Sequence, residues 1–450
     1  MNQFKGEKSL VSEKKERFSS SGFILAAIGS SVGLGNMWKF PYITGENGGA
    51  AFFLLFVICL MLIGLPVLLA ELAIGRSGRG SAATSFIRAG GGKGWKAAGI
   101  LQVIAPFLIL SFYIVVAGWT LNYAVIAFNG QLFSTSDYAG EFSSFITGYM
   151  PIVWQGTAML ITAGVVILGV SGGIEKFNKV LIPGLVVLLI VLMIRAVTLP
   201  GAGAGVSFFL KPDFSVLTAE SALVALGHAF FSLSLGMGIL LTYGSYVGEK
   251  QSLGSAALAI GAGDLLYAFI AGLIIFPTTF SFGIAPDQGP SLIFVALPAA
   301  FSAMPFGSFF GGLFFILLAI AALTSAVSLL EVPVSFAMER WNWSRQRAVW
   351  ILSLICFLFG IPSAMSLGMF PELTFGGKAL FDWIDFITSN IMLPLGGLLV
   401  TIFVGYFWKG AAEAAGLQAR WFRVWLFMLR YVAPILVFLV LLHTSGILTF

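Results

Sequence analysis

Long apolar stretches recur along the whole chain and constrain its fold more than any other feature. A bilayer core about 30 Å thick is spanned by roughly 20 apolar residues in a helix, and we count eleven such stretches. Apolar residues make up 58% of the 450 residues and charged residues 10%, whereas soluble domains have roughly 45–50% and about 25%. The sequence therefore predicts an all-α integral membrane protein and argues against a soluble enzyme. The expected spans are 21–43, 49–75, 97–128, 151–171, 177–199, 217–246, 255–281, 308–338, 347–368, 378–408 and 421–446.

Positive charge is distributed unevenly between the two sides of the predicted bundle. Of the 24 lysines and arginines, all but four fall in segments on the side of the amino terminus. The four are Lys39, Arg195, Lys211 and Lys378. Because lysine and arginine are enriched in cytoplasmic loops, we expect a multi-pass protein of the plasma membrane whose residues 1–20 lie in the cytoplasm. The lipid bilayer is its expected surrounding, and no obligatory protein partner is evident.

The basic residues form no stripe that could follow a phosphate backbone. Nucleic acid is therefore not an expected partner.

Two connecting segments have compositions of their own. The glycine-rich, basic segment 76–96 reads as a flexible loop near anionic lipid, and the proline-punctuated segment 285–306 is expected to form a re-entrant hairpin on the outer side.

Two predicted spans contain clusters of small residues in corresponding positions. The first span carries a glycine-rich run at 29–36, and the sixth carries Ser232 to Gly238, five spans later. Glycine disfavours helix by about 1 kcal/mol relative to alanine, and paired breaks of this kind indicate a transporter with two inverted halves. The expected organisation is a first repeat at 21–199, a second at 217–408, and an eleventh helix at 421–446. The alternative is that small residues only allow close helix packing.

Broken helices have a definite chemistry. A half-helix amino terminus offers free N–H groups that suit a carboxylate, while freed carbonyls suit a bare cation. In the eighth span, Ala321, Thr324 and Ser325 share one helix face. The hydroxyls of Thr324 and Ser325 either bind an ion or form hydrogen bonds to their own helix. Asp264 lies inside an apolar run, where a carboxylate is costly and is by default a functional residue. An amino acid with sodium fits this set of groups.

The sequence around the breaks resembles a known family. Residues 29–42 read GSSVGLGNMWKFPY and are followed by ENGG at 46–49, which closely resembles the signature of the neurotransmitter:sodium symporter family. The similarity continues at Glu71–Gly75, Trp119–Leu121, Phe231–Gly236 and Ala321–Ser325. Length and composition are most similar to the bacterial amino-acid branch. The resemblance implies a membrane transporter rather than an enzyme, with no organic cofactor.

The resemblance implies two sodium sites. Sodium site 1 matches Ser31, Asn36, Ser232 and Asp264. Sodium site 2 matches the carbonyls of Gly29, Val32 and Ala321 with the hydroxyls of Thr324 and Ser325. Chloride-requiring members have asparagine in place of Asp264, so the carboxylate here implies transport without chloride.

The same matching implies a substrate pocket. In the family, backbone N–H groups and a tyrosine hydroxyl bind the substrate carboxylate, and carbonyls of the sixth helix bind the amine. Monoamine carriers have aspartate where this chain has Gly33, which favours an amino-acid substrate. The mostly apolar wall implies hydrophobic L-amino acids, aliphatic and aromatic. The matched residues are Ser30, Gly33, Leu34, Gly35, Ile109, Tyr113, Phe231, Ser234, Gly236, Met237, Gly238, Ser325 and Leu329.

Gate residues follow from the resemblance as well. Lys39 and Asp385 match an outer charged pair, although the family usually has arginine at the first position. Lys15, Phe18 and Glu339 loosely match an inner arginine, tryptophan and acid that tie down the amino-terminal segment. Gly173 and Pro183 match a motif at which the fifth helix can unwind on the cytoplasmic side.

Three further polar residues lie in apolar segments. We expect His228 to be a neutral, hydrogen-bonded core residue rather than a proton relay. Glu71 and Glu331 are expected to brace a broken helix rather than to bind ions.

The two histidines in the chain leave little for acid–base catalysis. A channel would require a continuous pore, whereas the glycine-rich breaks indicate a closed central pocket. A sensor that binds without transporting stays an alternative, which a flux measurement separates from a carrier.

Overall fold

A computed structural model describes residues 17–285, 292–372, 374–444 and 447. The described residues are almost entirely helical. The α-helices are α1 (Ser20–Ser31), α2 (Phe40–Glu46), α3 (Ala50–Cys59), α4 (Leu65–Gly78), α5 (Ala82–Arg88), α6 (Lys96–Phe128), α7 (Tyr138–Thr147), α8 (Met150–Ile167), α9 (Glu175–Val197), α10 (Ala202–Leu210), α11 (Ala219–Ser232), α12 (Ile239–Ser245), α13 (Leu253–Ser281), α14 (Leu297–Ser302), α15 (Gly307–Trp341), α16 (Arg345–Ser366), α17 (Leu380–Asp385), α18 (Leu393–Ile402), α19 (Ala411–Ala415), α20 (Ala419–Phe427) and α21 (Ala433–Thr444).

Shorter elements connect or continue these helices. The π-helical segments are η1 (Gly35–Lys39), η2 (Leu60–Gly64), η5 (Val170–Ile174), η7 (Leu292–Ala296), η8 (Phe386–Met392), η9 (Phe403–Phe407) and η10 (Met428–Val432). The 3-10 turns are η3 (Lys93–Trp95), η4 (Gln131–Phe133) and η6 (Phe214–Val216). Strands β1 (Thr374–Phe375) and β2 (Lys378–Ala379) pair antiparallel, with Thr374 opposite Ala379.

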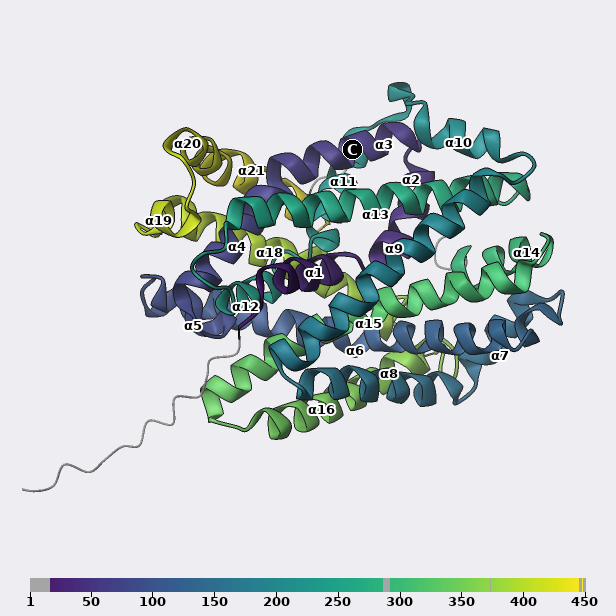
Figure 1. The fold of residues 1–450 in the computed structure, drawn as a ribbon, viewed down its shortest axis with the longest axis horizontal. Coiled ribbons are helices and arrows are strands. Elements are labelled where there is room, and N and C mark those ends of the chain that lie inside the picture. Colours follow the sequence, from purple (N-terminus) through teal and green to yellow (C-terminus); the bar gives the residue numbers. More distant parts are fainter. Residues whose placement is uncertain (1–16, 286–291, 373, 445–446, 448–450) are drawn as a thin grey trace, which may run out of the picture.

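The long helices run roughly side by side, with short helices at both ends of the bundle (Figure 1). Helices α5 and α19 lie at one end and α7, α10 and α14 at the other. Within the described residues, nine helical stretches are long and apolar enough to cross a membrane. The two broken helices, α1 with η1 and α2, and α11 with α12, bring the number to the eleven expected. The chain is an all-α membrane protein.

Most spans match the predicted boundaries to within a few residues, but three expectations need comment. The fifth span begins at Val170 rather than at 177. The segment 76–96, expected as a flexible loop, contains the ordered helix α5. Of the expected outer hairpin at 285–306, residues 292–302 form η7 and α14, whose side chains are largely buried, while 286–291 fall outside the described residues.

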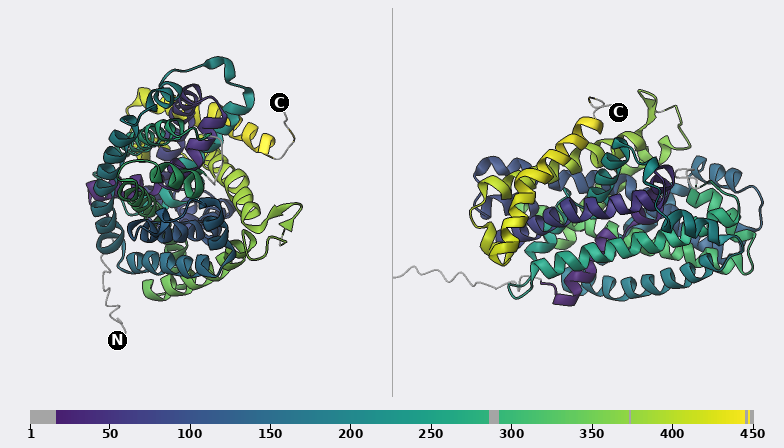
Figure 2. Two further views of the ribbon diagram at one scale, coloured as in Figure 1. Left: turned by 90° about the vertical axis from the view of Figure 1, so that its right-hand side faces the viewer. Right: turned by 90° about the horizontal axis from the view of Figure 1, so that it is seen from above.

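Helix α15 forms the centre of the bundle. In its most apolar window 83% of the residues are buried, compared with 28% for α9 and for the last span. It packs against α1, α6, α8 and α9. Figure 2 shows the last span, α20 with α21 in yellow, at the periphery of the bundle. The central position of α15 places Ala321, Thr324 and Ser325 beside the break in the first helix.

Candidate functional site

The first span is interrupted between Ser31 and Gly35. Helix α1 ends at Ser31, and the chain resumes in η1 and α2. A side chain on Gly33 would come within 2.7 Å of the Ser325 hydroxyl and 3.2 Å of the Tyr113 hydroxyl. The break therefore lies against α15 and α6, and only glycine fits there without displacing these hydroxyls.

The second interruption lies between Ser232, where α11 ends, and Ile239, where α12 begins. Three of the intervening residues have left-handed backbone: Ser234 (φ 55°), Gly236 (φ 76°) and Gly238 (φ 69°). The N–H of Gly236 donates to Glu71 Oε1 at 2.7 Å. A buried backbone N–H without a partner would cost about 1–3 kcal/mol, so the Glu71 carboxyl group stabilises the break. This confirms the expected bracing role of Glu71.

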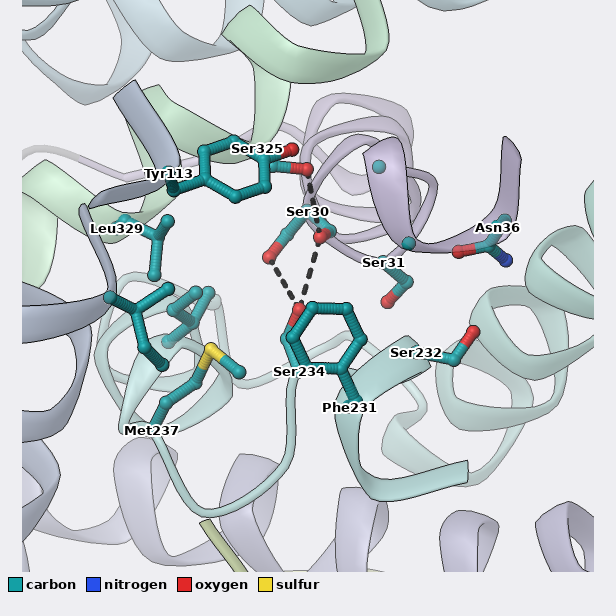
Figure 3. A pocket seen from close by; sticks show the side chains of 14 residues that line it. Ser30, Ser31, Asn36, Tyr113, Phe231, Ser232, Ser234, Met237, Ser325 and Leu329 are labelled. Carbon is teal, nitrogen blue, oxygen red and sulfur yellow. Dashed lines mark hydrogen bonds between the residues drawn. The ribbon is translucent and has the colours of Figure 1, made fainter. Parts of the chain in front are cut away.

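A cavity lies between the two breaks (Figure 3). Its volume is about 30 Å³, room for roughly two water molecules. Hydrogen bonds join three of the five serines that line it. The Ser234 hydroxyl donates to the Ser30 carbonyl at 3.0 Å, and the Ser325 hydroxyl donates to the same carbonyl at 3.3 Å. The lining residues are Ser30, Ser31, Gly33, Gly35, Asn36, Ile109, Tyr113, Phe231, Ser232, Ser234, Met237, Ile239, Ser325 and Leu329.

Most of the predicted substrate-pocket residues line this cavity, but Leu34, Gly236 and Gly238 do not. The N–H of Leu34 donates to the Tyr113 hydroxyl at 3.3 Å. Gly236 lies against the backbone of Leu393 and Gly238 against the carbonyl of Gln102, each so close that a Cβ would clash. Both glycines therefore allow the break to pack closely, and their contact with substrate stays a prediction. Ile239, which lines the cavity, was missed because it lies beyond the glycine cluster.

Asp264 lies fully buried at one side of the cavity, at the middle of α13. It accepts hydrogen bonds from Asn36 Nδ2 at 2.8 Å and from the Ser232 hydroxyl at 2.7 Å. The side-chain oxygen of Asn36 has no hydrogen-bond partner among the described residues. Three of the four residues predicted for sodium site 1 are thus in direct contact. The fourth, Ser31, donates to its own helix at Ala27 (3.3 Å).

The residues predicted for sodium site 2 lie where α1 meets α15. The Ser325 hydroxyl reaches the carbonyl of Gly29 at 3.4 Å. The hydroxyl of Thr324 donates to the Ala321 carbonyl of its own helix at 3.1 Å. Val32 is the C-cap residue that follows the last residue of α1. Hydroxyl and carbonyl oxygens from both helices therefore gather at this contact, which is a ligand set suited to a hard cation.

The predicted outer pair lies next to Phe231. Lys39 Nζ is 3.9 Å from Asp385 Oδ2 and 4.9 Å from the centre of the Phe231 ring. Asp385 also accepts from the Ser389 hydroxyl at 2.6 Å. Both charged side chains are partly exposed, so the long ion pair contributes about 0–1 kcal/mol at most. It is consistent with a gate that opens easily.

The predicted inner residues are arranged differently from the expectation. Phe18 is buried, packs edge-on against Tyr243 at 5.2 Å, and donates its N–H to the Tyr246 carbonyl at 3.3 Å. Glu339 is held by α5: it accepts from Ser81 N–H at 2.6 Å and the Thr84 hydroxyl at 2.8 Å and pairs with Arg88. Among the described residues Glu339 therefore binds the 81–88 segment rather than the amino-terminal segment. Lys15 lies outside the described residues.

Gly173 and Pro183 flank the start of helix α9. Gly173 lies in η5, so close to the carbonyl of Val165 that a side chain would clash. Pro183 lies inside α9, where it removes one helical hydrogen bond. The segment between them is helical in this structure.

Two other polar residues gave mixed outcomes. Glu331 accepts from the Tyr246 hydroxyl and from Arg345, both at 2.7 Å, so it does connect the sixth span to α15 and α16. His228 is buried between Phe40 and Phe56, and neither ring nitrogen has a partner among the described residues. The expected hydrogen bonding of His228 is therefore wrong.

Comparisons with known proteins agree with this architecture. A family model described as the sodium:neurotransmitter symporter family matches residues 15–139 and 139–448. The chain is 39% identical to the uncharacterized sodium-dependent transporter YhdH of Bacillus subtilis, over 96% of this chain and 98% of that protein. It is 36% identical to an uncharacterized sodium-dependent transporter of Haemophilus influenzae, over 93% and 95%.

A solved structure is also similar. The crystal structure of MhsT in complex with L-phenylalanine matches with a TM-score of 0.90 and 46% identity, covering 96% of this chain and 100% of that one. These findings confirm the resemblance that the motifs indicated.

Proposed function

The chain belongs to the sodium:neurotransmitter symporter family and is a sodium-dependent membrane transporter, and from this premise we propose that it imports hydrophobic L-amino acids, aliphatic and aromatic, by alternating access. Two inverted repeats, 21–199 and 217–408, would expose one central site in turn to the outside and to the cytoplasm. The amino terminus is proposed to lie in the cytoplasm and the protein in the plasma membrane.

The observation that carries the proposal is the cavity between the two helix breaks. Its side-chain wall combines Ile109, Met237, Ile239 and Leu329 with Phe231, whereas its polar groups are hydroxyls, backbone groups and the Asn36 amide. An apolar wall with few polar groups favours an apolar side chain. No lysine, arginine or acidic side chain is among the lining residues, so a charged substrate would lack a counter-ion. That MhsT was crystallised with L-phenylalanine supports the same substrate class.

The cavity is small, about 30 Å³, so entry of a bulky apolar side chain requires its wall to move. Met237 is unbranched and flexible, and such side chains adapt to ligands of different shape. Phe231 is only half-buried and lies below Lys39. Rotation of these two side chains would enlarge the cavity toward the outer pair.

Two sodium ions are proposed as the coupled cargo. The first would bind at Asp264, Asn36, Ser232 and Ser31, with the substrate carboxylate, and the second at Gly29, Val32, Ala321, Thr324 and Ser325. Because Asp264 supplies a negative charge beside the first ion, we propose transport without chloride. Each sodium ion that enters gains about 2.3 kcal/mol per 100 mV of membrane potential.

Competition binding tests the substrate class. Purified protein in sodium buffer should bind radiolabelled tryptophan, and unlabelled leucine or phenylalanine should displace it, whereas lysine and glutamate should not. Displacement by lysine or glutamate, without displacement by leucine, would refute the proposed specificity. The same measurement in sodium chloride and sodium gluconate should give equal binding, and a requirement for chloride would refute the anion-independent mechanism.

A further inference from the structure

One face of helix α9 lies along helix α1, close to the proposed second sodium site. Glu175 accepts from Ser19 N–H at 2.9 Å and from the Ser19 hydroxyl at 2.5 Å, and Lys179 Nζ donates to the same hydroxyl at 3.1 Å. One turn deeper, Asn178 and Ile182 adjoin Gly29. The two helices can approach this closely because Gly22 and Gly29, seven residues apart, present no side chain at the contact. Figure 1 shows α1 crossing close to α9 in the middle of the molecule.

Asn178 is the unusual residue on this face. Its side chain is fully buried, and its Nδ2 donates to the Ile174 carbonyl at 2.9 Å. That bond fixes the amide orientation, so Oδ1 points away from Ile174 and toward α1. A Cβ built on Gly29 would lie 2.0 Å from this oxygen. The Asn178 oxygen thus occupies the space that a side chain at position 29 would fill, and it has no hydrogen-bond partner among the described residues.

A buried acceptor without a partner is rare in folded proteins and usually has a functional reason. Here the oxygen lies against Gly29, whose carbonyl is a proposed ligand of the second sodium ion. Amide oxygens are suitable ligands for hard cations. Asn178 also lies within the segment from Gly173 to Pro183, where a glycine and a proline weaken the helix.

Resting on the function proposed above, we propose that the Asn178 side-chain oxygen is a transient sodium ligand, which the second ion binds as it leaves Gly29 toward the cytoplasm. If no such oxygen were present, water alone would have to replace the protein ligands that the ion leaves. The amide replaces one of them before the ion is fully hydrated, and so lowers the barrier to release. It does not belong to the bound-state site, so the equilibrium affinity for sodium does not depend on it.

Three substitutions separate the oxygen from the helix bond that the same side chain makes. Asn178→Leu removes both. Asn178→Ser keeps a donor for the Ile174 carbonyl through its hydroxyl, since serine bonds back to its own helix, but its shorter side chain no longer reaches Gly29. Asn178→Asp keeps an oxygen beside Gly29.

The experiment measures dissociation of radioactive sodium from the purified full-length protein after dilution, together with the sodium midpoint of tryptophan binding. We expect Asn178→Leu and Asn178→Ser to release sodium at least fivefold more slowly than the wild type. Asn178→Asp should retain a rate within twofold of the wild type. The sodium midpoint should change by less than threefold in all three.

The matched control is Gln155→Leu. Gln155 is also fully buried, donates its Nε2 to a carbonyl (Phe357, 3.0 Å) and leaves its Oε1 without a partner among the described residues, but it lies on α8 against α16. Its replacement should leave the release rate unchanged. A slowed Gln155→Leu would show a general effect of losing a buried amide, and would overturn the proposal.

Other outcomes are equally decisive. A wild-type rate of sodium release in Asn178→Leu would refute the transient ligand. So would a wild-type rate in Asn178→Ser together with a slowed rate in Asn178→Asp, because that pattern identifies the hydrogen bond to Ile174 as the important interaction. A tenfold change in the sodium midpoint would make Asn178 part of the equilibrium site instead. If the wild type bound no sodium at all, the proposed function itself would fail, and this inference with it.

Discussion

Asp264 is the residue on which the proposed ion chemistry depends most. It is a fully buried carboxyl group whose two partners, Asn36 and Ser232, come from the two broken helices. A buried charge of this kind is costly unless another charge compensates it. Neither partner carries a positive charge, so a bound cation is the compensation that we infer.

Asp264→Asn tests this inference directly. The substitution keeps size and hydrogen-bonding capacity but removes the charge, and interactions with a charged group contribute about 1.5–3 kcal/mol. We therefore expect the sodium concentration for half-maximal tryptophan binding to rise at least tenfold, as measured by a sodium titration. Asp382→Asn, at an exposed position of α17, is the control. An unchanged midpoint in Asp264→Asn would contradict the assignment of the first site.

Thr324 is the corresponding test of the second site. Its hydroxyl bonds to its own helix, and Thr120 in α6 makes the same type of bond, to Ala117 at 2.7 Å, in an equally buried position. Thr324→Val and Thr120→Val therefore remove equivalent hydroxyls. Only Thr324→Val should weaken sodium-dependent binding, by about fivefold or more. Equal effects of the two substitutions would mean that the Thr324 hydroxyl merely serves its helix.

At the scale of elements, the break in the sixth span depends on Glu71. Its carboxyl group, on α4, holds the Gly236 N–H where the backbone has left the helix. Replacing it by leucine leaves a buried N–H without a partner, at a cost of about 1–3 kcal/mol. Thermal unfolding in detergent should show a clearly lower midpoint for Glu71→Leu than for Glu71→Gln, which keeps an acceptor oxygen. Identical midpoints would show that the break does not need this hydrogen bond.

The contact between α9 and the start of α1 is a second interaction that stabilises a helix end. Glu175 accepts two hydrogen bonds from Ser19, the residue that caps α1, and a third from Lys179. Loss of a helix cap costs about 1 kcal/mol, so Glu175→Ala should loosen the first turn of α1. Hydrogen–deuterium exchange should become several-fold faster at residues 20–24. The control Glu413→Ala, at an exposed position of α19, should leave exchange at residues 20–24 unchanged. Unchanged exchange in Glu175→Ala as well would show that the contact with Ser19 does not stabilise α1.

The same elements show what could be predicted from the sequence. Long apolar runs and paired small-residue clusters predicted the number of spans and both breaks, and the resemblance to the symporter family predicted most of the cavity wall. The start of the fifth span was missed because the charged pair Glu175 and Lys176 precedes the apolar run, whereas Glu175 finds its partner on Ser19. The partner of Glu339 was missed because it lies far away in the sequence. Contacts such as Glu339 with Ser81 join residues 258 positions apart, and no local pattern reports them.

At the scale of the molecule, helices α6 and α15 and the two broken helices line a cavity. The long helices of the bundle run roughly side by side around them (Figures 1 and 2). Phe231 in the cavity wall lies under Lys39, and Phe18 near the start of α1 packs on Tyr243; we propose these two contacts as the outer and the inner closure. A transporter needs two such closures that open in turn. The arrangement fits a state in which both are shut.

The central claim is that sodium drives the accumulation of a hydrophobic amino acid. The most direct test is uptake of radiolabelled leucine and tryptophan into liposomes that contain the purified protein, with an inward sodium gradient or with potassium in place of sodium. We predict accumulation of both amino acids above the external concentration with sodium, and none with potassium. Sodium-dependent binding without accumulation would contradict the account and identify a sensor instead, and uptake that is indifferent to sodium would contradict both proposed ion sites.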